Sequence, residues 1–484
     1  MDPEQSRTPL FDTVLAHAKK RMVSFHTPGH KNGKSIDQRF RNFVGRNIFY
    51  MDVTVFNEVD SLHDPHHCIR QAQLLAAKAY EADRAFFLIN GSTVGNQAMI
   101  LTACNTFDEI ILPRNTHKSI IGGIILAGAT PRYIQPVIDR NNNIVYNVSP
   151  EQVEDAIKRY PKAKAVIITN PTYHGISTNL SGIAEVVHKY DKILLVDEAH
   201  GPHFKFSPRL PISAIDAGAD MCVQSTHKIL SGMSQGSLLL VKGKRVDPHR
   251  VKRIVSVLQT TSPSYFILGS IDLARMQMAT KGEAILDKLI DMCEEGRRQI
   301  NKIEHIACLR QEDLLPGFQL DPTKITVMLG QSGLSGYDVS ALFNEKYNLQ
   351  VDYEDLYNII AISGVGTSKQ DIRQLVFALQ DICSKYAKKK VIKALPPLSF
   401  ATEMVINPMQ ALEMGMKRVP IEKAVGRISA HILSPYPPGI PVLIPGERIT
   451  REVCDYLQEL VKMGIRVSGQ EGHTLKTLKV VQES

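Results

Sequence analysis

Five short apolar runs stand out in the first half of the chain, and polar residues follow each of them. The runs occupy residues 85–89, 109–112, 164–169, 192–197 and 220–224. Helical segments separate them, which is typical of buried parallel strands in an α/β protein. Ligands of open α/β sheets bind at the carboxyl ends of such strands. The pattern therefore predicts a parallel sheet with a ligand site along one edge.

Asp197 ends one of these runs, and Ser225-Thr226-His227-Lys228 follows the next one. An acid and a lysine at neighbouring strand ends can face one crevice, which is the arrangement that pyridoxal phosphate requires. The lysine amine forms a Schiff base, and the aspartate keeps the pyridine nitrogen protonated so that the ring accepts electrons. For this pair alone, a surface lysine and a helix-capping aspartate are the alternative.

A glycine turn with hydroxyl side chains follows the first run. The segment Asn90-Gly91-Ser92-Thr93-Val94-Gly95-Asn96 leads into a helix over residues 97–104. Backbone N–H groups and the helix dipole can hold a phosphate there, and Ser92 and Thr93 can donate further hydrogen bonds. The turn matches neither Gly-x-Gly-x-x-Gly nor a Walker loop, which weakens a dinucleotide or nucleoside-triphosphate interpretation. A helix N-cap without a ligand is the alternative.

Three further polar side chains occupy strand ends. His117 follows the second run, and its imidazole could lie flat on an aromatic cofactor; a capping or buried histidine is the alternative. Tyr173 follows the third run, and His200 comes shortly after Asp197. We expect Tyr173 and His200 to contact the substrate. Hydroxyls, an imidazole, a tyrosine, an aspartate and a lysine thus converge on one predicted site.

Two histidine-rich segments precede most of the strands. Residues 25–33 contain two glycines, a proline and two histidines, which predicts a loop. The three histidines within 63–67 could suggest a metal, but no acid or cysteine at ligand spacing completes a site, so we expect none. Asp64-Pro65 instead predicts the N-cap and first position of a helix that continues over residues 69–80.

Composition excludes several classes of protein. The net charge is +8, but the basic residues are dispersed, and the dense run at 385–393 predicts a solvated linker rather than a nucleic-acid patch. Seven scattered cysteines without a Cys-x-x-Cys pair indicate neither a disulfide framework nor a zinc ribbon. No apolar run approaches the roughly 18 residues of a membrane span, and the first residues lack an apolar signal region. We expect a soluble cytoplasmic protein that binds neither nucleic acid nor membrane.

Several motifs resemble those of the Orn/Lys/Arg decarboxylase family. They are Phe25-His26-Thr27-Pro28-Gly29-His30, Pro113-Arg114-Asn115-Thr116-His117-Lys118-Ser119, Asp197-x-Ala199-His200, Ser225-Thr226-His227-Lys228, and Tyr436-Pro437-Pro438-Gly439 with Pro445-Gly446-Glu447. The resemblance covers nearly the whole chain in the family's order. It implies an aspartate-aminotransferase-like pyridoxal-phosphate enzyme of fold type I with a mostly parallel seven-stranded sheet. The chain looks closest to the short bacterial arginine/lysine decarboxylase group without the N-terminal wing domain, and a homodimer with active sites at the subunit interface is implied.

The resemblance also implies a role for each matched residue around the cofactor ring. Lys228 would be the Schiff-base lysine, and Asp197 would hold the pyridine nitrogen. His117 would stack on the ring, and Ala199 would pack beneath it, where a larger side chain would collide.

Other matched residues would hold the phosphate and the substrate. Thr261, within the segment 260–263, would reach the phosphate of the neighbouring subunit. Glu447 would lie near the substrate entrance, also at the subunit boundary. Four residues would hold the phosphate in their own subunit: Ser92, Thr93, Ser225 and His227.

The implied reaction is decarboxylation of a basic L-amino acid. Arginine, giving agmatine and CO2 for polyamine biosynthesis, is favoured by resemblance over lysine (to cadaverine) or ornithine (to putrescine). His227 or Lys228 would return a proton to the α-carbon. The same groups could serve an aminotransferase or lyase of this fold, or persist in a catalytically silent regulatory homologue, although Lys228 and Asp197 argue against the last. The acid that distinguishes the substrates by side-chain length could be Glu447 or one of the acids within 352–355, and the sequence does not decide between them.

A length of 484 residues implies two or three domains around separate cores. The helical stretch 264–303 is of the kind that joins a large domain to a small one, and strands and helices over 325–388 predict an α+β layer. Leu395-Pro396-Pro397 marks a further boundary. We predict an N-terminal helix and active-site loop arm (1–60), a pyridoxal-phosphate-binding large domain (61–300), a small α+β domain (301–393) and a C-terminal decarboxylase domain (394–484).

Overall fold

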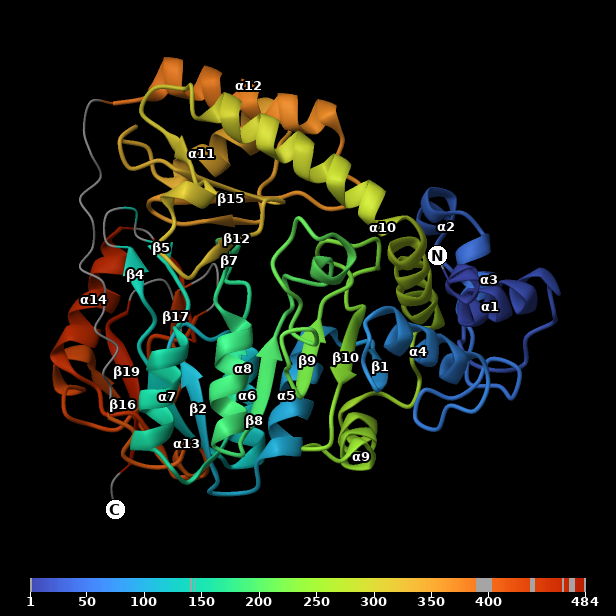
Figure 1. The fold of residues 1–484 in the computed structure, drawn as a ribbon, viewed down its shortest axis with the longest axis horizontal. Coiled ribbons are helices and arrows are strands. Elements are labelled where there is room, and N and C mark those ends of the chain that lie inside the picture. The colour runs from blue at the N-terminus through green and yellow to red at the C-terminus, as the bar shows by residue number, and fades with distance from the viewer. Residues whose placement is uncertain are drawn as a thin grey trace. The chain divides into compact units, whose positions relative to one another are not determined.

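The computed structural model describes residues 2–139, 142, 144–388, 403–435, 440–463, 465–469 and 475–482 (Figure 1). They divide into two compact units. The first comprises Met1–Met99, Asp197–Lys288 and Gly364–Gly366, and the second comprises Ile100–Val196, Leu289–Ser363 and Thr367–Ser484. Three features singled out in the sequence lie outside the described residues: Tyr436-Pro437-Pro438-Gly439, residues 389–393 of the basic run, and Leu395-Pro396-Pro397.

The largest sheet has seven strands. In hydrogen-bonded order they are β1 (Arg84–Leu88), β10 (Ser237–Val241), β9 (Met221–Gln224), β8 (Ile193–Asp197), β6 (Ala163–Thr169), β2 (Glu109–Pro113) and β3 (Thr130–Ile134). Strand β2 runs parallel to β3 and β6, whereas β10 runs antiparallel to β1 and β9. Nearly every residue of β6, β8 and β9 is buried, as continuous apolar runs require. The predicted mostly parallel, seven-stranded sheet is therefore confirmed.

In the first unit, the beginning of the chain is fixed on a long helix. The helices of this unit are η1 (Pro3–Ser6), α1 (Pro9–Lys19), α2 (Gln38–Val44), α3 (Asn47–Met51), α4 (Cys68–Ala79), α5 (Gly91–Ala103), η2 (Phe204–Phe206), α9 (Pro248–Leu258) and α10 (Tyr265–Ile300), of which α5 and α10 continue into the second unit. Asp272 and Arg275 of α10 form a buried ion pair of 2.6 Å. Asp272 accepts the Leu10 N–H at 3.0 Å, and Arg275 donates to the Gln5 carbonyl at 2.6 Å. The predicted long helix over 264–303 is confirmed.

The start of α4 differs from the sequence prediction. Asp64-Pro65 does not cap the helix, because α4 begins at Cys68 and its N-cap residue is His67. Instead, the buried Asp60 carboxylate accepts the backbone N–H groups of the helix start, at 2.8–3.1 Å. Burial raises the pKa of Asp60, but these hydrogen bonds outweigh it and hold the pKa below its ordinary value. The acid that satisfies the helix start lies well upstream, where a local capping rule does not search.

The second unit contains most of the remaining helices and strands. Helices α6 (Lys118–Ala127), α7 (Pro150–Arg159) and α8 (Leu180–Lys189) alternate with the strands, and the short strands are β4 (Ile138–Asp139), β5 (Ile144–Val145), β7 (Ile176–Ser177) and β12 (Gln319–Leu320). A four-stranded sheet has the order β11 (Ala307–Cys308), β13 (Lys324–Met328), β15 (Asn358–Ile362), β14 (Tyr353–Glu354). Helix α12 (Lys369–Tyr386) lies alongside the C-terminal part of α10 (Figure 1), with η3 (Gln311–Asp313), α11 (Gly336–Leu342) and η4 (Phe343–Tyr347) nearby in the chain. This part forms the predicted α+β layer.

The C-terminal part of the second unit has its own apolar cluster. It contains α13 (Pro408–Glu413), β16 (Met416–Pro420), η5 (Ile421–Lys423), β17 (Ser434–Pro435), α14 (Arg451–Lys462), β18 (Val467–Ser468) and β19 (Thr477–Val481). Strand β16 pairs antiparallel with β19, and the buried face of α14 packs into the same cluster. Across the described residues, the helices lack the combined length and apolar character that a membrane crossing needs. The four-part domain division stays a prediction.

Candidate active site

Strand β8 ends in Asp197, whose carboxylate is buried with 3% of the residue exposed. The Asn96 side-chain amide donates to its Oδ2 atom at 2.8 Å, and the Ala199 N–H donates to Oδ1 at 3.2 Å. Within the described part of the chain, Asp197 forms no ion pair. Burying a carboxylate without a cation is costly. The site is therefore suited to a cation that comes with a ligand, such as a protonated ring nitrogen.

Asn96 reaches Asp197 because α5 packs closely against β9. Gly91 begins the helix with a φ of +67°, a conformation that favours glycine, and a Cβ atom at Gly95 would collide with Val223 of β9. Asn96 follows Ser92 by one helical turn, so both side chains lie on one face of α5. Asn96 was not predicted as a site residue, although its spacing of one helical turn from Ser92 was a usable signal.

Three buried hydroxyl groups meet at the start of α5. The Ser92 Oγ atom lies 2.7 Å from Ser225 Oγ and 3.2 Å from Ser237 Oγ. They come from the first turn of α5, the end of β9 and the start of β10. Hydroxyls together with the free N–H groups of a helix start form an anion site. Ser237 was missed because it begins an apolar strand and follows no strand end, whereas Thr93, which was predicted, is exposed on α5.

The Lys228 amine is paired with an imidazole. Its Nζ atom lies 2.8 Å from His200 Nε2. The neighbouring His227 has Nδ1 at 2.8 Å from the Gly236 carbonyl, so this nitrogen carries the proton and donates it. Burial lowers the pKa of His227, which keeps the imidazole neutral near pH 7. An amine and two histidines are therefore positioned to exchange protons.

The first unit brings together most of the predicted site. Hydrogen bonds and chain adjacency link Ser92, Asp197, Ala199, His200, Ser225, His227 and Lys228. Thr261 lies on the exposed loop after α9, where the Ser262 N–H donates to Thr260 Oγ1 at 3.1 Å. Its contact with a neighbouring subunit stays a prediction.

Two predicted residues lie near strand ends in the second unit. His117 is the N-cap of α6: its Nδ1 atom accepts the Ser119 N–H at 3.2 Å and lies 2.8 Å from Ser119 Oγ. The Tyr173 carbonyl accepts the Lys324 amine at 3.0 Å, and the Tyr173 ring lies 6.1 Å from the Tyr353 ring. The roles of His117 at the cofactor and of Tyr173 at the substrate stay predictions.

Glu447 has a strong internal partner in the second unit. Its fully buried carboxylate accepts the Arg114 guanidinium and the Ile444 N–H, both at 2.9 Å. Arg114 also donates to the Val442 carbonyl at 3.0 Å, and its guanidinium carbon lies 4.5 Å from the Tyr133 ring centroid. The expected contact of Glu447 with substrate stays a prediction. Arg114 stands in a motif quoted above, but its pairing was not foreseen.

Comparison with known proteins first defines the class of fold. The solved lysine decarboxylase LdcF of Francisella novicida matches this structure with a TM-score of 0.85 at 24% sequence identity, over 98% of this chain and 81% of that one. The predicted α/β fold of the aspartate-aminotransferase-like type I is confirmed.

Sequence comparison then defines the family. The model of the Orn/Lys/Arg decarboxylase major domain matches residues 8–371, and that of the C-terminal domain matches residues 390–475. Arginine decarboxylases of Halalkalibacterium halodurans and Bacillus anthracis are 40% and 38% identical to this chain, each over 99% of this chain and 98% of the relative. The chain belongs to the Orn/Lys/Arg decarboxylase family.

Proposed function

We propose that this chain is a pyridoxal-phosphate-dependent decarboxylase of a basic L-amino acid, and that it converts arginine to agmatine and CO2. The observation that carries the proposal is the Lys228 amine, next to His200, in the same unit as the buried Asp197 carboxylate. Family membership supports decarboxylation. The names of the relatives favour arginine over lysine and ornithine.

The donor set supports pyridoxal phosphate as the cofactor. A lysine amine is present for covalent attachment, and Asp197 is a buried carboxylate without a cation among the described residues. The hydroxyl cluster of Ser92, Ser225 and Ser237 supplies donors for a phosphate at the start of α5. A cationic ring nitrogen, a reactive carbonyl and a phosphate would each find a partner.

When bound, pyridoxal phosphate supplies an electron sink next to the substrate's α-carbon. Lys228 would hold the cofactor covalently through its amine. Asp197 holds the proton on the pyridine nitrogen, and its charge makes that nitrogen more basic. His200 exchanges a proton with the Lys228 amine. Lys228 or the neutral His227 returns the proton to the α-carbon after CO2 has left.

The remaining residues position the cofactor and the substrate. His117 would stack on the ring and Ala199 would pack beneath it. Ser92, Thr93, Ser225 and His227 would hold the phosphate, together with the partner subunit's Thr261. Tyr173, His200 and Glu447 contact the substrate. We further propose a homodimer in the cytoplasm, where the seven cysteines, none of which forms a disulfide in the described part of the chain, would stay reduced.

The test combines a spectrum with product detection. The purified protein should show a visible absorbance band that borohydride reduction removes. Supplied separately with arginine, lysine and ornithine, it should release CO2 and the corresponding amine, fastest with arginine. A protein that stays colourless with added pyridoxal phosphate would refute the cofactor, and a preference for lysine or ornithine would refute the substrate.

The variant Lys228→Ala tests the assignment of the lysine that attaches the cofactor. Loss of the attaching amine should lower turnover by roughly a thousandfold or more, with the circular dichroism spectrum unchanged. Normal activity in this variant would refute the assignment of Lys228. Product release that requires a keto acid would indicate an aminotransferase, and a protein that binds the cofactor but turns over none of the three amino acids would indicate a silent homologue.

A further inference from the structure

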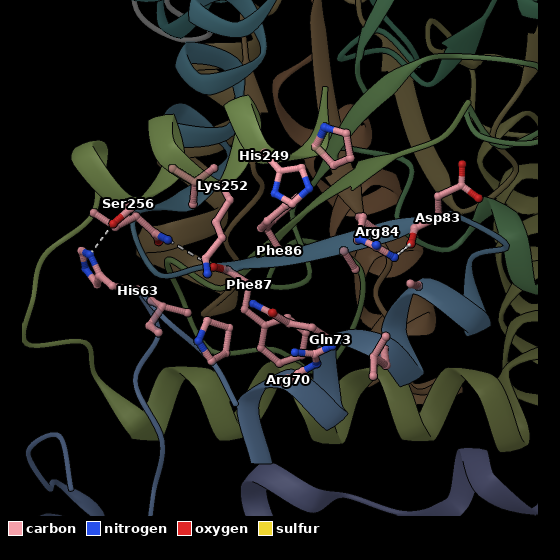
Figure 2. Close-up of a pocket in the computed structure, with 18 residues that line it drawn as sticks. His63, Arg70, Gln73, Asp83, Arg84, Phe86, Phe87, His249, Lys252 and Ser256 are labelled. Atoms are coloured by element: carbon pink, nitrogen blue, oxygen red, sulfur yellow. Dashed lines mark hydrogen bonds between the residues drawn. The ribbon is translucent and has the colours of Figure 1, made fainter. Parts of the chain in front are cut away.

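A hollow in the first unit is lined by none of the residues assigned to the proposed cofactor site. It has a volume of about 280 Å³ and lies between α4, β1 and α9. Figure 2 shows His249 and Lys252 of α9 on one side and Arg70 and Gln73 of α4 on the other, with Phe86 and Phe87 of β1 between them. This volume is close to the lower end of the range for small-molecule sites.

The lining of the hollow carries an excess of positive charge. Arg70, Arg84 and Lys252 line it, together with His249, whereas Asp83 is the only acid among the described lining residues. The Asp83 carboxylate already accepts the Gly243 N–H at 2.8 Å. Three cationic side chains from three different elements thus line the hollow, and the Asp83 carboxylate among them is already hydrogen-bonded. The hollow therefore favours an anionic ligand.

The cations differ in how far they are already paired. The Lys252 amine donates to Asp64 at 2.7 Å, an exposed pair on the rim. Arg84 donates only to the neighbouring Asp83 carbonyl, at 3.0 Å. In the described part of the chain, the Arg70 guanidinium has no carboxylate partner and no side-chain hydrogen bond. Arg70 is therefore the cation most open to a ligand.

The floor of the hollow is apolar. Phe87 and Ala85 of β1 are buried, and Leu74 of α4 is 50% exposed at the edge. His63 forms a fixed wall: its Nε2–H donates to the Thr260 carbonyl at 2.8 Å, and its Nδ1 atom lies 2.7 Å from the Ser256 hydroxyl oxygen. A ligand would need an apolar body as well as a negative charge.

We propose that this hollow binds a small organic anion: an apolar ring that carries a phosphate or carboxylate group. The ring packs against the apolar floor of the hollow, and the anionic group lies between Arg70 and Lys252. Aromatic and apolar walls with a few converging charged groups are the usual composition of such sites. Arginine and lysine both bind phosphate and carboxylate, arginine through two parallel hydrogen bonds.

One lining residue connects the hollow to the turn that leads into α5. The Gln259 amide donates to the Phe87 carbonyl at 3.3 Å and accepts the Ile89 N–H at 2.9 Å. Ile89 is followed by the glycine turn and Ser92, the start of the proposed phosphate site. Binding of the anion therefore alters the affinity for the cofactor, and the cofactor alters the affinity for the anion by the same factor. This coupling rests on the proposed function.

The test uses the cofactor-loaded enzyme and phenyl phosphate as the probe, with binding followed by calorimetry. Arg70→Gln should weaken binding about tenfold, the loss expected for one desolvated charge contact. Arg253→Gln is the matched control, because Arg253 lies next to Lys252 on α9 but does not line the hollow; its affinity should change less than about twofold. Inorganic phosphate and benzyl alcohol should each bind at least about tenfold more weakly than phenyl phosphate.

Four outcomes would overturn the proposal. The first three are equal binding to Arg70→Gln and the parent, equal loss in Arg253→Gln, and binding that displaces the cofactor, which would assign the probe to the cofactor site. If Arg70→Gln instead changes the sedimentation coefficient and phenyl phosphate does not bind, a second copy of the chain covers the hollow and the proposal is wrong. Unchanged cofactor release at saturating phenyl phosphate would refute the coupling through Gln259. Saturable binding of phenyl phosphate to a colourless protein would support the anion site in the hollow and refute only the proposed function.

Discussion

Two buried carboxylates, Asp197 in the first unit and Glu447 in the second, have opposite surroundings. Asp197 is 3% exposed and receives only neutral donors, the Asn96 amide and a backbone N–H. Glu447 is fully buried and receives the Arg114 guanidinium. The charge of Glu447 is compensated within the chain, whereas that of Asp197 is left for a ligand. Burial of an acid therefore does not by itself indicate a ligand site; the presence of an internal cation has to be considered as well.

The position of each acid in the chain explains the difference. Asp197 ends a buried strand, and the two donors that reach its carboxylate, the Asn96 amide and the Ala199 N–H, carry no charge. Glu447 belongs to the C-terminal segment, and Arg114 stands shortly before His117 at the end of β2. Their ion pair joins two distant parts of the second unit and supports the loop that carries His117. We therefore expect loss of the first acid to affect mainly the chemistry, and loss of the second to affect stability in addition to the substrate contact proposed above.

The largest effect is expected for Glu447→Ala. The substitution leaves the Arg114 charge buried without a partner, and breaking such a pair costs about 3–5 kcal/mol of unfolding free energy. Denaturant unfolding measures the loss. The double variant Arg114→Leu, Glu447→Leu is the control, since it removes both charges and should recover most of the stability. If the single and double variants are equally destabilised, packing rather than the charge pair holds this region.

Asp197→Asn tests the other side of the comparison. The amide keeps the shape of the side chain but removes the charge that holds the ring nitrogen protonated, so the rate of CO2 release should fall by about a hundredfold to a thousandfold. Unfolding of the cofactor-free protein should change by less than about 1 kcal/mol, because a costly buried charge disappears. A normal rate, or a stability loss as large as that of Glu447→Ala, would contradict the assignment of Asp197.

A smaller effect is expected at the residue that holds Asp197. Asn96→Ala removes one hydrogen bond to a charged group, worth about 1.5–3 kcal/mol, and should lower cofactor affinity about tenfold or more. Gln97→Ala, the next residue on α5, is the matched control. Equilibrium dialysis of the cofactor would separate the two variants. Equal affinities would mean that the Asp197 carboxylate keeps its orientation without the amide.

Sequence patterns predicted the features that depend on local order along the chain. Continuous apolar runs identified the strands of the central sheet, and polar residues at their ends identified Asp197, His200 and Lys228. The long helix α10 also followed from its periodicity. Such features are predictable because each one is set by neighbours in the sequence.

Contacts between distant segments were not predicted. Asp60 satisfies the start of α4 in place of Asp64, Ser237 joins the hydroxyl cluster from the start of a strand, and Arg114 pairs with Glu447 across much of the chain. Each of these depends on how elements pack, which spacing alone does not specify. The roles of Tyr173 and Thr261 and the four-part domain division stay predictions.

Glu198, directly after Asp197, is a third buried carboxylate, and like Asp197 it accepts one side-chain amide and one backbone N–H. It is fully buried, accepts the Ala214 N–H at 2.7 Å and lies 2.6 Å from the Gln224 amide. Burial raises the pKa of Glu198 from 4.5 to about 8, because neutral donors only partly offset the loss of water. Glu198 is therefore protonated near pH 7. An uncharged neighbour adds no repulsion to the negative charge of Asp197.

The smallest effect is expected for Glu198→Gln, when it is measured as the change in unfolding free energy per pH unit. In the parent, the folded state binds a proton that the unfolded state has lost between pH 4.5 and about 8, so the unfolding free energy falls as pH rises through this window. The slope contributed by this one group is at most about 1.4 kcal/mol per pH unit. The variant carries no such proton, and its stability should decline less steeply from pH 5 to pH 8. Parallel stability curves would show that Glu198 is already ionised in the folded protein, and two adjacent buried anions would then share the end of β8.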